Sequence, residues 1–213
     1  MAALLRDGLD RHGPAPPLTT LSLSRPSSAI YRAAWLSAGL AVAALSRAAL
    51  NQGGSTAAFL AGTGFGLALL CLALVAGWRP SRPGLRSLGI GLVGGAVLIA
   101  VPMLAGPSTR AVVGMRPEPF VVWFGVTVLV VTAEEVLLRG ALLATLDEAA
   151  GPAVAVLATS AAFALMHLPL YGWGVVPIDL GAGMLLAGLR YLSGGVAAPT
   201  VAHLLADLAT WWL

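Results

Sequence analysis

Charged residues are scarce in this sequence. Only 10% of its 213 residues are charged, whereas an average soluble domain has about 25%. There is no lysine, so all 12 basic residues are arginine, and the single cysteine is Cys71. A lone cysteine excludes an intrachain disulfide and a cysteine-rich metal site. The arginines form no basic run with interleaved aromatic residues, so the net charge of +3 does not indicate a nucleic-acid partner.

Hydrophobic residues make up 58% of the chain, more than one soluble core covered by a polar surface would contain. They occur in runs of roughly 17–25 residues, each long enough to cross about 30 Å of hydrocarbon as a helix. The apolar residues are continuous and do not alternate with polar ones, which argues against a transmembrane barrel. The composition therefore predicts an all-α, polytopic transmembrane helical bundle of about seven spanning helices, with eight as the alternative.

Glycine and proline mark the breaks between the apolar runs. Residues 1–29 are rich in proline, serine and threonine and are predicted to be a flexible N-terminal cytoplasmic tail. Residues 30–213 are predicted to be the transmembrane helical domain. Its expected spans are 30–50, 55–77, 88–105, 120–146, 152–168, 175–191 and 196–213.

The arginines indicate the orientation of these spans, because cytoplasmic loops carry an excess of positive charge. Placing the N-terminus in the cytoplasm leaves Arg47, Arg110 and Arg116 outside and Arg139 within the membrane, with all the others inside. The use of arginine alone, together with many Ala, Gly, Leu and Val residues, is typical of a GC-rich bacterial genome. We therefore predict a multi-pass protein of the bacterial inner (plasma) membrane.

Three charged residues fall inside the predicted span 120–146: Glu134, Glu135 and Arg139. Each charge near the middle of a membrane helix costs about 2.5–3.5 kcal/mol on insertion scales. Glu135 and Arg139 are spaced i,i+4 and can pair on one face. Glu134 points about 100° away around the helix, which leaves it to face something else. The alternative is that all three residues form a packing device.

Two later spans also carry ionisable residues. One ends in Phe163-x-x-x-His167, where the phenyl ring can pack against the imidazole, and the other contains His203-x-x-x-Asp207. An aspartate at this spacing can fix the tautomer of the histidine. Each motif alone is as often structural as functional. Together with Glu134, they predict one polar cavity within the bundle.

These three motifs, in this order on successive membrane helices, resemble those of the CAAX protease and bacteriocin-processing (CPBP, or Abi) family of intramembrane glutamic endopeptidases, which is related to the type II CAAX prenyl endopeptidases. The resemblance covers about residues 120–210. It implies that Glu134 is the general base that activates water and that His167 helps to hold this water. It also implies that His203 and Asp207 stabilise the oxyanion, while Glu135 and Arg139 orient the site. Asp207 stands where the family often has asparagine, so it would orient His203 or act protonated.

The resemblance implies peptide or membrane-protein substrates, lipid as the surrounding partner, and catalysis without a cofactor. Zinc bound by Glu134, His167 and His203 is the alternative, although the chain has no His-Glu-x-x-His motif. A non-catalytic scaffold or immunity protein of the same fold is the competing function. A proton-coupled transporter is a third reading, which the lack of a convincing internal repeat disfavours.

Overall fold

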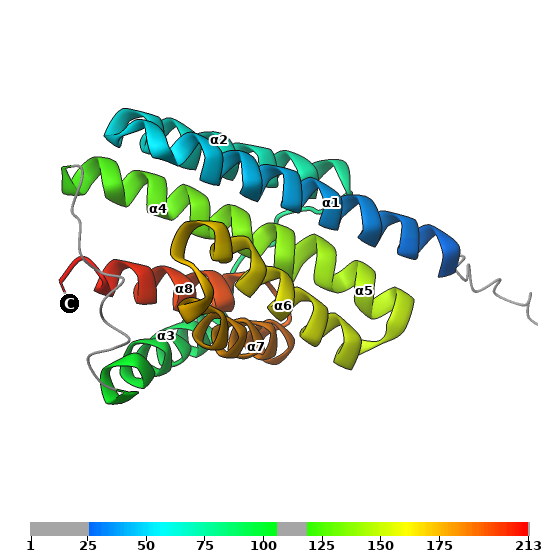
Figure 1. The fold of residues 1–213 in the computed structure, drawn as a ribbon. Helices are drawn as coiled ribbons and strands as arrows, with labels where there is room; N and C mark the ends of the chain where they lie inside the picture. Colours follow the sequence, from blue (N-terminus) through cyan, green and yellow to red (C-terminus); the bar gives the residue numbers. More distant parts are fainter. Residues whose placement is uncertain (1–25, 106–118, 213) are drawn as a thin grey trace, which may run out of the picture.

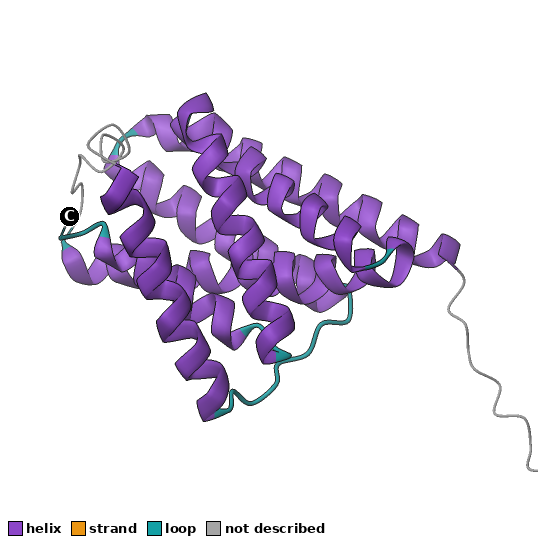
Figure 2. Cartoon of the chain, turned by 90° about the horizontal axis from the view of Figure 1, so that it is seen from below, coloured by secondary structure: helices purple, strands orange, loops and turns teal. Residues whose placement is uncertain are grey.

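The computed structural model describes residues 26–105 and 119–212. Within these residues all regular structure is helical, as Figures 1 and 2 show. Most of the predicted N-terminal tail lies outside the described residues, as do Arg110 and Arg116. Each of the seven expected spans corresponds to a helix, and the predicted all-α helical bundle is confirmed.

The described residues form eight α-helices and three short segments of other helix types. They are α1 (Pro26–Leu50), the 3₁₀ turn η1 (Asn51–Gly53), α2 (Ser55–Val75), α3 (Leu85–Ala105), α4 (Phe120–Glu135), the π-helix η3 (Val136–Leu142), α5 (Leu143–Ala150), α6 (Pro152–Tyr171), the 3₁₀ turn η4 (Trp173–Val175), α7 (Val176–Ser193) and α8 (Ala197–Ala209).

Five helical stretches of the described chain are long and apolar enough to cross a membrane. They are Ser28–Gly53, Thr56–Val75, Phe120–Ala150, Pro152–Tyr171 and Trp173–Ser193. Leu85–Val101 and Ala197–Ala209 are shorter apolar helices. The 13 residues of α8 rise about 20 Å, less than the roughly 30 Å of a hydrocarbon core. Helix α8 is therefore shorter than the span expected at 196–213 and lies among longer helices.

Helix α8 packs against α3, α4 and α7. On one side of the bundle α1 and α2 lie alongside each other, with α2 on α4 and α1 on α5 (Figure 1). On the other side α6 pairs with α7. This arrangement brings residues from helices that are distant in sequence to the point where α4 passes into the π-helix.

The π-helix Val136–Leu142 follows directly after Glu135 and is buried throughout. It lies between α4 and α5, which it joins into one helical stretch without a break from Phe120 to Ala150. π segments of this kind are rare and frequent at functional sites. Arg190 on α7 donates a hydrogen bond from Nε to the carbonyl oxygen of Arg139, at 3.1 Å. A side chain of α7 thus binds the backbone of the π segment.

Helices α6 and α7 meet closely at Gly183. A Cβ atom on this glycine would lie 2.9 Å from Cα of Ser160. Small residues at such contacts allow the backbones of membrane helices to approach each other. Because the obstructing atom belongs to the backbone, a methyl group could be accommodated only if the two helices moved apart.

Gly183→Ala is therefore expected to destabilise the bundle by about 1–3 kcal/mol, the usual cost of overpacking. Thermal unfolding in detergent would measure this loss. The matched control is Gly181→Ala on the same helix, where an added Cβ meets nothing within 4 Å and helix propensity favours alanine. If both variants melt at the wild-type temperature, the close contact does not limit stability.

Candidate active site

The six residues singled out in the sequence lie in one cluster. Glu134 and Glu135 end α4, and Arg139 lies in the π-helix. His167 comes from the C-terminal part of α6, and His203 and Asp207 come from α8. Ion pairs, ring contacts and electrostatic interactions connect all six side chains.

Glu135 is the carboxylate of the cluster that forms direct hydrogen bonds, all through Oε1, whereas its buried Oε2 has no hydrogen-bond partner among the described residues. Its Oε1 accepts a hydrogen bond from Nη1 of Arg139 at 3.1 Å and another from Nδ1 of His203 at 2.9 Å. Glu135 and Arg139 are both 0% exposed, and Nη2 of Arg139 also donates to the carbonyl oxygen of Gly183 at 3.3 Å. The predicted pairing of Glu135 with Arg139 is confirmed. The contact with His203 means that Glu135 fixes this ring from its Nδ1 side.

The other side of the His203 ring faces two further carboxylates. Its Nε2 lies 3.6 Å from Oδ1 of Asp207 and 3.9 Å from Oε2 of Glu134. The side chain of Asp207 is 43% exposed, so it stands at the open edge of the cluster. The shorter contact of His203 is with Glu135, and Asp207 therefore acts on a ring that is already held.

Glu134 is buried and incompletely partnered. Only 1% of it is exposed, and within the described residues its Oε1 has no hydrogen-bond partner. Its two ion-pair distances, 3.6 Å to Arg47 and 3.9 Å to His203, exceed the usual range of a direct hydrogen bond. Because buried polar atoms are nearly always hydrogen-bonded, this carboxylate has lone pairs free for a third group such as water or substrate.

Arg47 is the first residue that the sequence reasoning missed. It was expected among the external charges, but it lies on α1, 19% exposed, with Nη1 facing Oε1 of Glu134. Its guanidinium carbon is 4.8 Å from the centroid of the Phe65 ring of α2. The available signal was its position inside the apolar span 30–50, since a charge within a span needs a partner.

Asp179 is the second missed residue. Its Oδ2 lies 3.2 Å from Nδ1 of His167, and the same Nδ1 is 3.1 Å from the carbonyl oxygen of Phe163. A carbonyl oxygen can only accept, so Nδ1 carries a proton, and in the neutral form of the ring Nε2 is then an acceptor. The signal in the sequence was a carboxylate in the first turn of the apolar helix α7.

The Phe163 ring lies between the charged groups. It contacts the rings of His167 and His203 edge-on, with centroids 4.8 Å and 5.2 Å away, and Arg139 lies over it at 4.7 Å. The predicted contact between Phe163 and His167 is confirmed. Edge-on aromatic contacts and a cation over the ring are both favourable, so Phe163 fixes three site residues at once.

Asp179→Asn is expected to lower kcat by about 10–100-fold, by analogy with the loss of a carboxylate that orients a metal-bound histidine, with little change in KM. The amide keeps the shape but not the charge, so the His167 ring loses its preferred orientation. Steady-state kinetics on a cleaved peptide would measure this. Asp147→Asn on α5 is the matched control, and equal kcat in the two variants would contradict a positioning role for Asp179.

The described residues contain no group of three or more His, Cys, Asp or Glu side chains arranged to hold a metal ion. The zinc alternative requires Glu134, His167 and His203 to gather around one point. As placed, these side chains do not fit such a site, and no step below passes through a metal.

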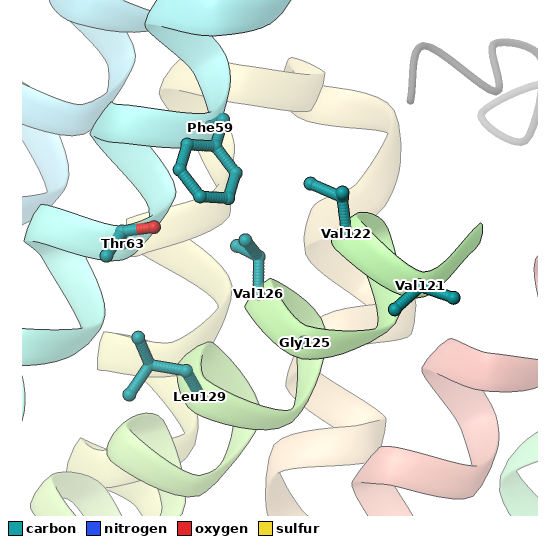
Figure 3. A pocket seen from close by; sticks show the side chains of 7 residues that line it. All are labelled: Phe59, Thr63, Val121, Val122, Gly125, Val126 and Leu129. Carbon is teal, nitrogen blue, oxygen red and sulfur yellow. The ribbon is translucent and has the colours of Figure 1, made fainter. Parts of the chain in front are cut away.

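A separate shallow groove lies between α2 and α4 (Figure 3). Its lining is apolar apart from the hydroxyl of Thr63, with no carboxylate or imidazole. The lining residues are Phe59, Thr63, Val121, Val122, Gly125, Val126 and Leu129. This groove therefore lacks the carboxylate or imidazole that a general base would need.

Comparison with protein families identifies the part of the chain that carries this cluster. Residues 116–209 match the family model described as "Type II CAAX prenyl endopeptidase Rce1-like". These residues form an Rce1-like domain. The match supports, at the level of the family, the resemblance read from the three motifs. The comparison with curated proteins gave no match, and neither did the comparison with solved structures.

The Rce1-like domain contains Asp179 and all six residues named from the sequence, whereas Arg47 lies outside it. With its five long apolar helices, the protein is a multi-pass membrane protein, and its residues 116–209 match a CAAX-protease-like peptidase family.

Proposed function

We propose that this protein is an intramembrane endopeptidase that hydrolyses peptide bonds by means of a water molecule activated by Glu134. The observation that carries the proposal is the buried Glu134 carboxylate, whose Oε1 has no hydrogen-bond partner among the described residues. A carboxylate in a largely dehydrated setting, with free lone pairs and a histidine beside it, is suited to accept a proton from water.

The first step is addition of water to the peptide carbonyl. Glu134 takes one proton from the water, and the remaining hydroxide forms a bond to the carbonyl carbon. Nε2 of His167, an acceptor because Nδ1 donates to Phe163, helps to hold the water through its second hydrogen. The carbonyl π electrons move to oxygen and produce a tetrahedral oxyanion.

His203 is the proposed donor to this oxyanion. Three carboxylates surround its ring, at 2.9 Å, 3.6 Å and 3.9 Å, and favour a ring that carries a proton on both nitrogens. Nδ1–H then donates to Glu135, and Nε2–H is left to donate to the oxyanion. Preorganised donors in a site with little water stabilise such developing charge strongly.

The intermediate then collapses. The C–N bond breaks as Glu134 returns its proton to the leaving nitrogen, giving an amine and a carboxylic acid and restoring the ionised base. Asp207 lies at the open edge of the cluster, with Oδ1 3.6 Å from Nε2 of His203. The catalytic groups in this proposal are all side chains, so it includes no cofactor.

The proposed substrates are membrane-associated peptides or proteins, because the cluster lies among helices that lipid would surround. We place the protein in the bacterial inner membrane, with its N-terminus in the cytoplasm and without a nucleic-acid partner. The arginine distribution supports this orientation.

Comparing the peptides of cells that produce the wild type or Glu134→Gln tests the proposal. Membrane and secreted fractions would be profiled by mass spectrometry, with Asp147→Asn as the control. We expect cleavage products that are present with wild type and Asp147→Asn and lost with Glu134→Gln. Identical profiles in all three strains would favour the non-catalytic scaffold or immunity protein.

A chelator separates the metal-free mechanism from the zinc alternative. We expect hydrolysis by the purified protein to continue after chelator treatment and dialysis. Activity that disappears with the chelator and returns with added zinc would replace the mechanism described above.

A further inference from the structure

Arg47 brings a positive charge to the site from outside the Rce1-like domain. It lies in the last turn of α1, and its Nη1 is 3.6 Å from Oε1 of Glu134. The Phe65 ring of α2 lies beneath its guanidinium group, 4.8 Å from ring centroid to Cζ. Helix α1, which precedes the matched residues 116–209, therefore contacts the base of the proposed reaction through Arg47, and α2 supports this arginine through Phe65.

We propose that Arg47 is a positioning residue that favours the ionised form of Glu134 and turns its carboxylate, so that Oε2 faces His203. The inference rests on the proposed function of Glu134, and it adds α1 and α2 to the working site.

The distribution of charge in the cluster favours this role. Glu135 binds Arg139 directly at 3.1 Å, so the charge of that arginine is already matched. The other neighbours of Glu134 are two histidines and a further carboxylate, Asp207. An arginine stays charged throughout the physiological pH range, and in the proposed mechanism the Nε2 proton of His203 is directed to the oxyanion. Arg47 is therefore a counter-charge to Glu134 that takes no part in the proton transfers.

The geometry of Arg47 suits positioning rather than tight binding. At 3.6 Å the contact with Glu134 is an ion pair but not a short hydrogen bond, so the carboxylate keeps its accepting capacity for water. Phe65 is buried, with 4% of its surface exposed, and it supports the guanidinium plane from one side. A planar, stacked cation is a property of arginine that lysine does not share.

The two oxygens of Glu134 have different neighbours as a consequence. Oε1 faces Arg47 and Oε2 faces Nε2 of His203. This division aims one oxygen at the place where the proposed oxyanion donor lies. Without Arg47 the carboxylate could rotate or take up a proton, and in either case it would stop acting as a base.

A double-mutant cycle tests the ion pair without any substrate. Thermal unfolding in detergent would be measured for Arg47→Met, Glu134→Gln and the double variant, with Arg32→Met on the same helix as the control. We expect Arg47→Met to lower Tm by roughly 5 °C, as loss of one to two kcal/mol does in a chain of this size. In the Glu134→Gln background the same change should have little effect, because no charge is left to compensate.

The control Arg32→Met should shift Tm equally in both backgrounds. An Arg47→Met effect of the same size in both backgrounds would mean that the side chain only packs against Phe65, and this would overturn the inference.

Kinetics on a cleaved peptide test the positioning role directly. Arg47→Met is expected to lower kcat on the order of tenfold or more, part of the contribution of the base itself, with KM nearly unchanged. Arg47→Lys should recover part of that loss because it restores the charge.

Unchanged kcat in Arg47→Met, with activity still dependent on Glu134, would overturn the inference and leave the proposed function standing. If Glu134→Gln itself retains full activity, the proposed function fails. The melting cycle then still reports whether Arg47 and Glu134 form a stabilising pair.

Discussion

Glu134→Gln is expected to lower kcat for peptide hydrolysis by about 10²–10⁴-fold, the usual contribution of a general base. Glutamine has nearly the same shape and can still hydrogen-bond to water, but its amide does not take the proton. Because Glu134 has no short hydrogen bond within the described residues, its replacement breaks no direct hydrogen bond and removes only its longer ion pairs with Arg47 and His203. The measurement is steady-state cleavage by purified protein in detergent.

Two observations accompany this prediction. The variant should unfold near the wild-type temperature, which shows that the loss is chemical, and KM should change little, because the charge acts in the transition state. A variant that keeps more than about a third of wild-type kcat would assign the base to another residue. Asp207, the remaining carboxylate near Nε2 of His203, would then be tested in the same way.

Arg139→Met is expected to cost about 3–5 kcal/mol of stability, because it leaves Glu135 as a buried charge without its cation. Both side chains are 0% exposed, so water cannot compensate. The substitution also removes the hydrogen bond to Gly183 and the cation above Phe163. For a protein of this length the loss corresponds to a fall in Tm of roughly 6–20 °C.

The double variant Glu135→Met with Arg139→Met gives the matched comparison. Replacing both members of a buried ion pair by apolar groups is often close to neutral, so the double variant should melt well above Arg139→Met alone. It should still be inactive, because His203 loses the oxygen that holds its Nδ1. Equal melting temperatures for the single and double variants would contradict an ion-pair origin of the stability.

The helical bundle could be predicted from the sequence because its signals are local. Apolar runs interrupted by glycine and proline mark each helix, and the backbone hydrogen bonds of a helix lie within the run itself. The C-terminal end of α8 could not be predicted from the apolar run. Its apolar run continues to the C-terminal tryptophans, while the helix ends at Ala209. The π-helix was also not predicted, because the residue pattern of Val136–Leu142 does not distinguish a π-helix from an α-helix.

In the candidate site, too, the residues predicted from the sequence are those with a local signal or a recognisable motif. The pair Glu135 and Arg139 follows from i,i+4 spacing on one helix, and the three motifs identify the other site residues by resemblance. Arg47 and Asp179 reach the site only through packing between helices that are separate in sequence. Hydrophobic periodicity shows that a helix has a buried face but not which neighbour covers it. The catalytic roles of all these residues remain predictions.

The π-helix has a consequence for the way the bundle is assembled. Each added residue turns a helix by about 100°, so a wider turn changes the rotational phase of everything that follows it. Before the π segment, α4 presents its surface to α2 and α8, and after it, α5 faces α1 and α6. Glu134 and Glu135 lie where this change of phase begins. Deleting one residue from the segment would restore a regular helix and rotate α5 away from its partners, so the site and the docking of α1 depend on the same turn.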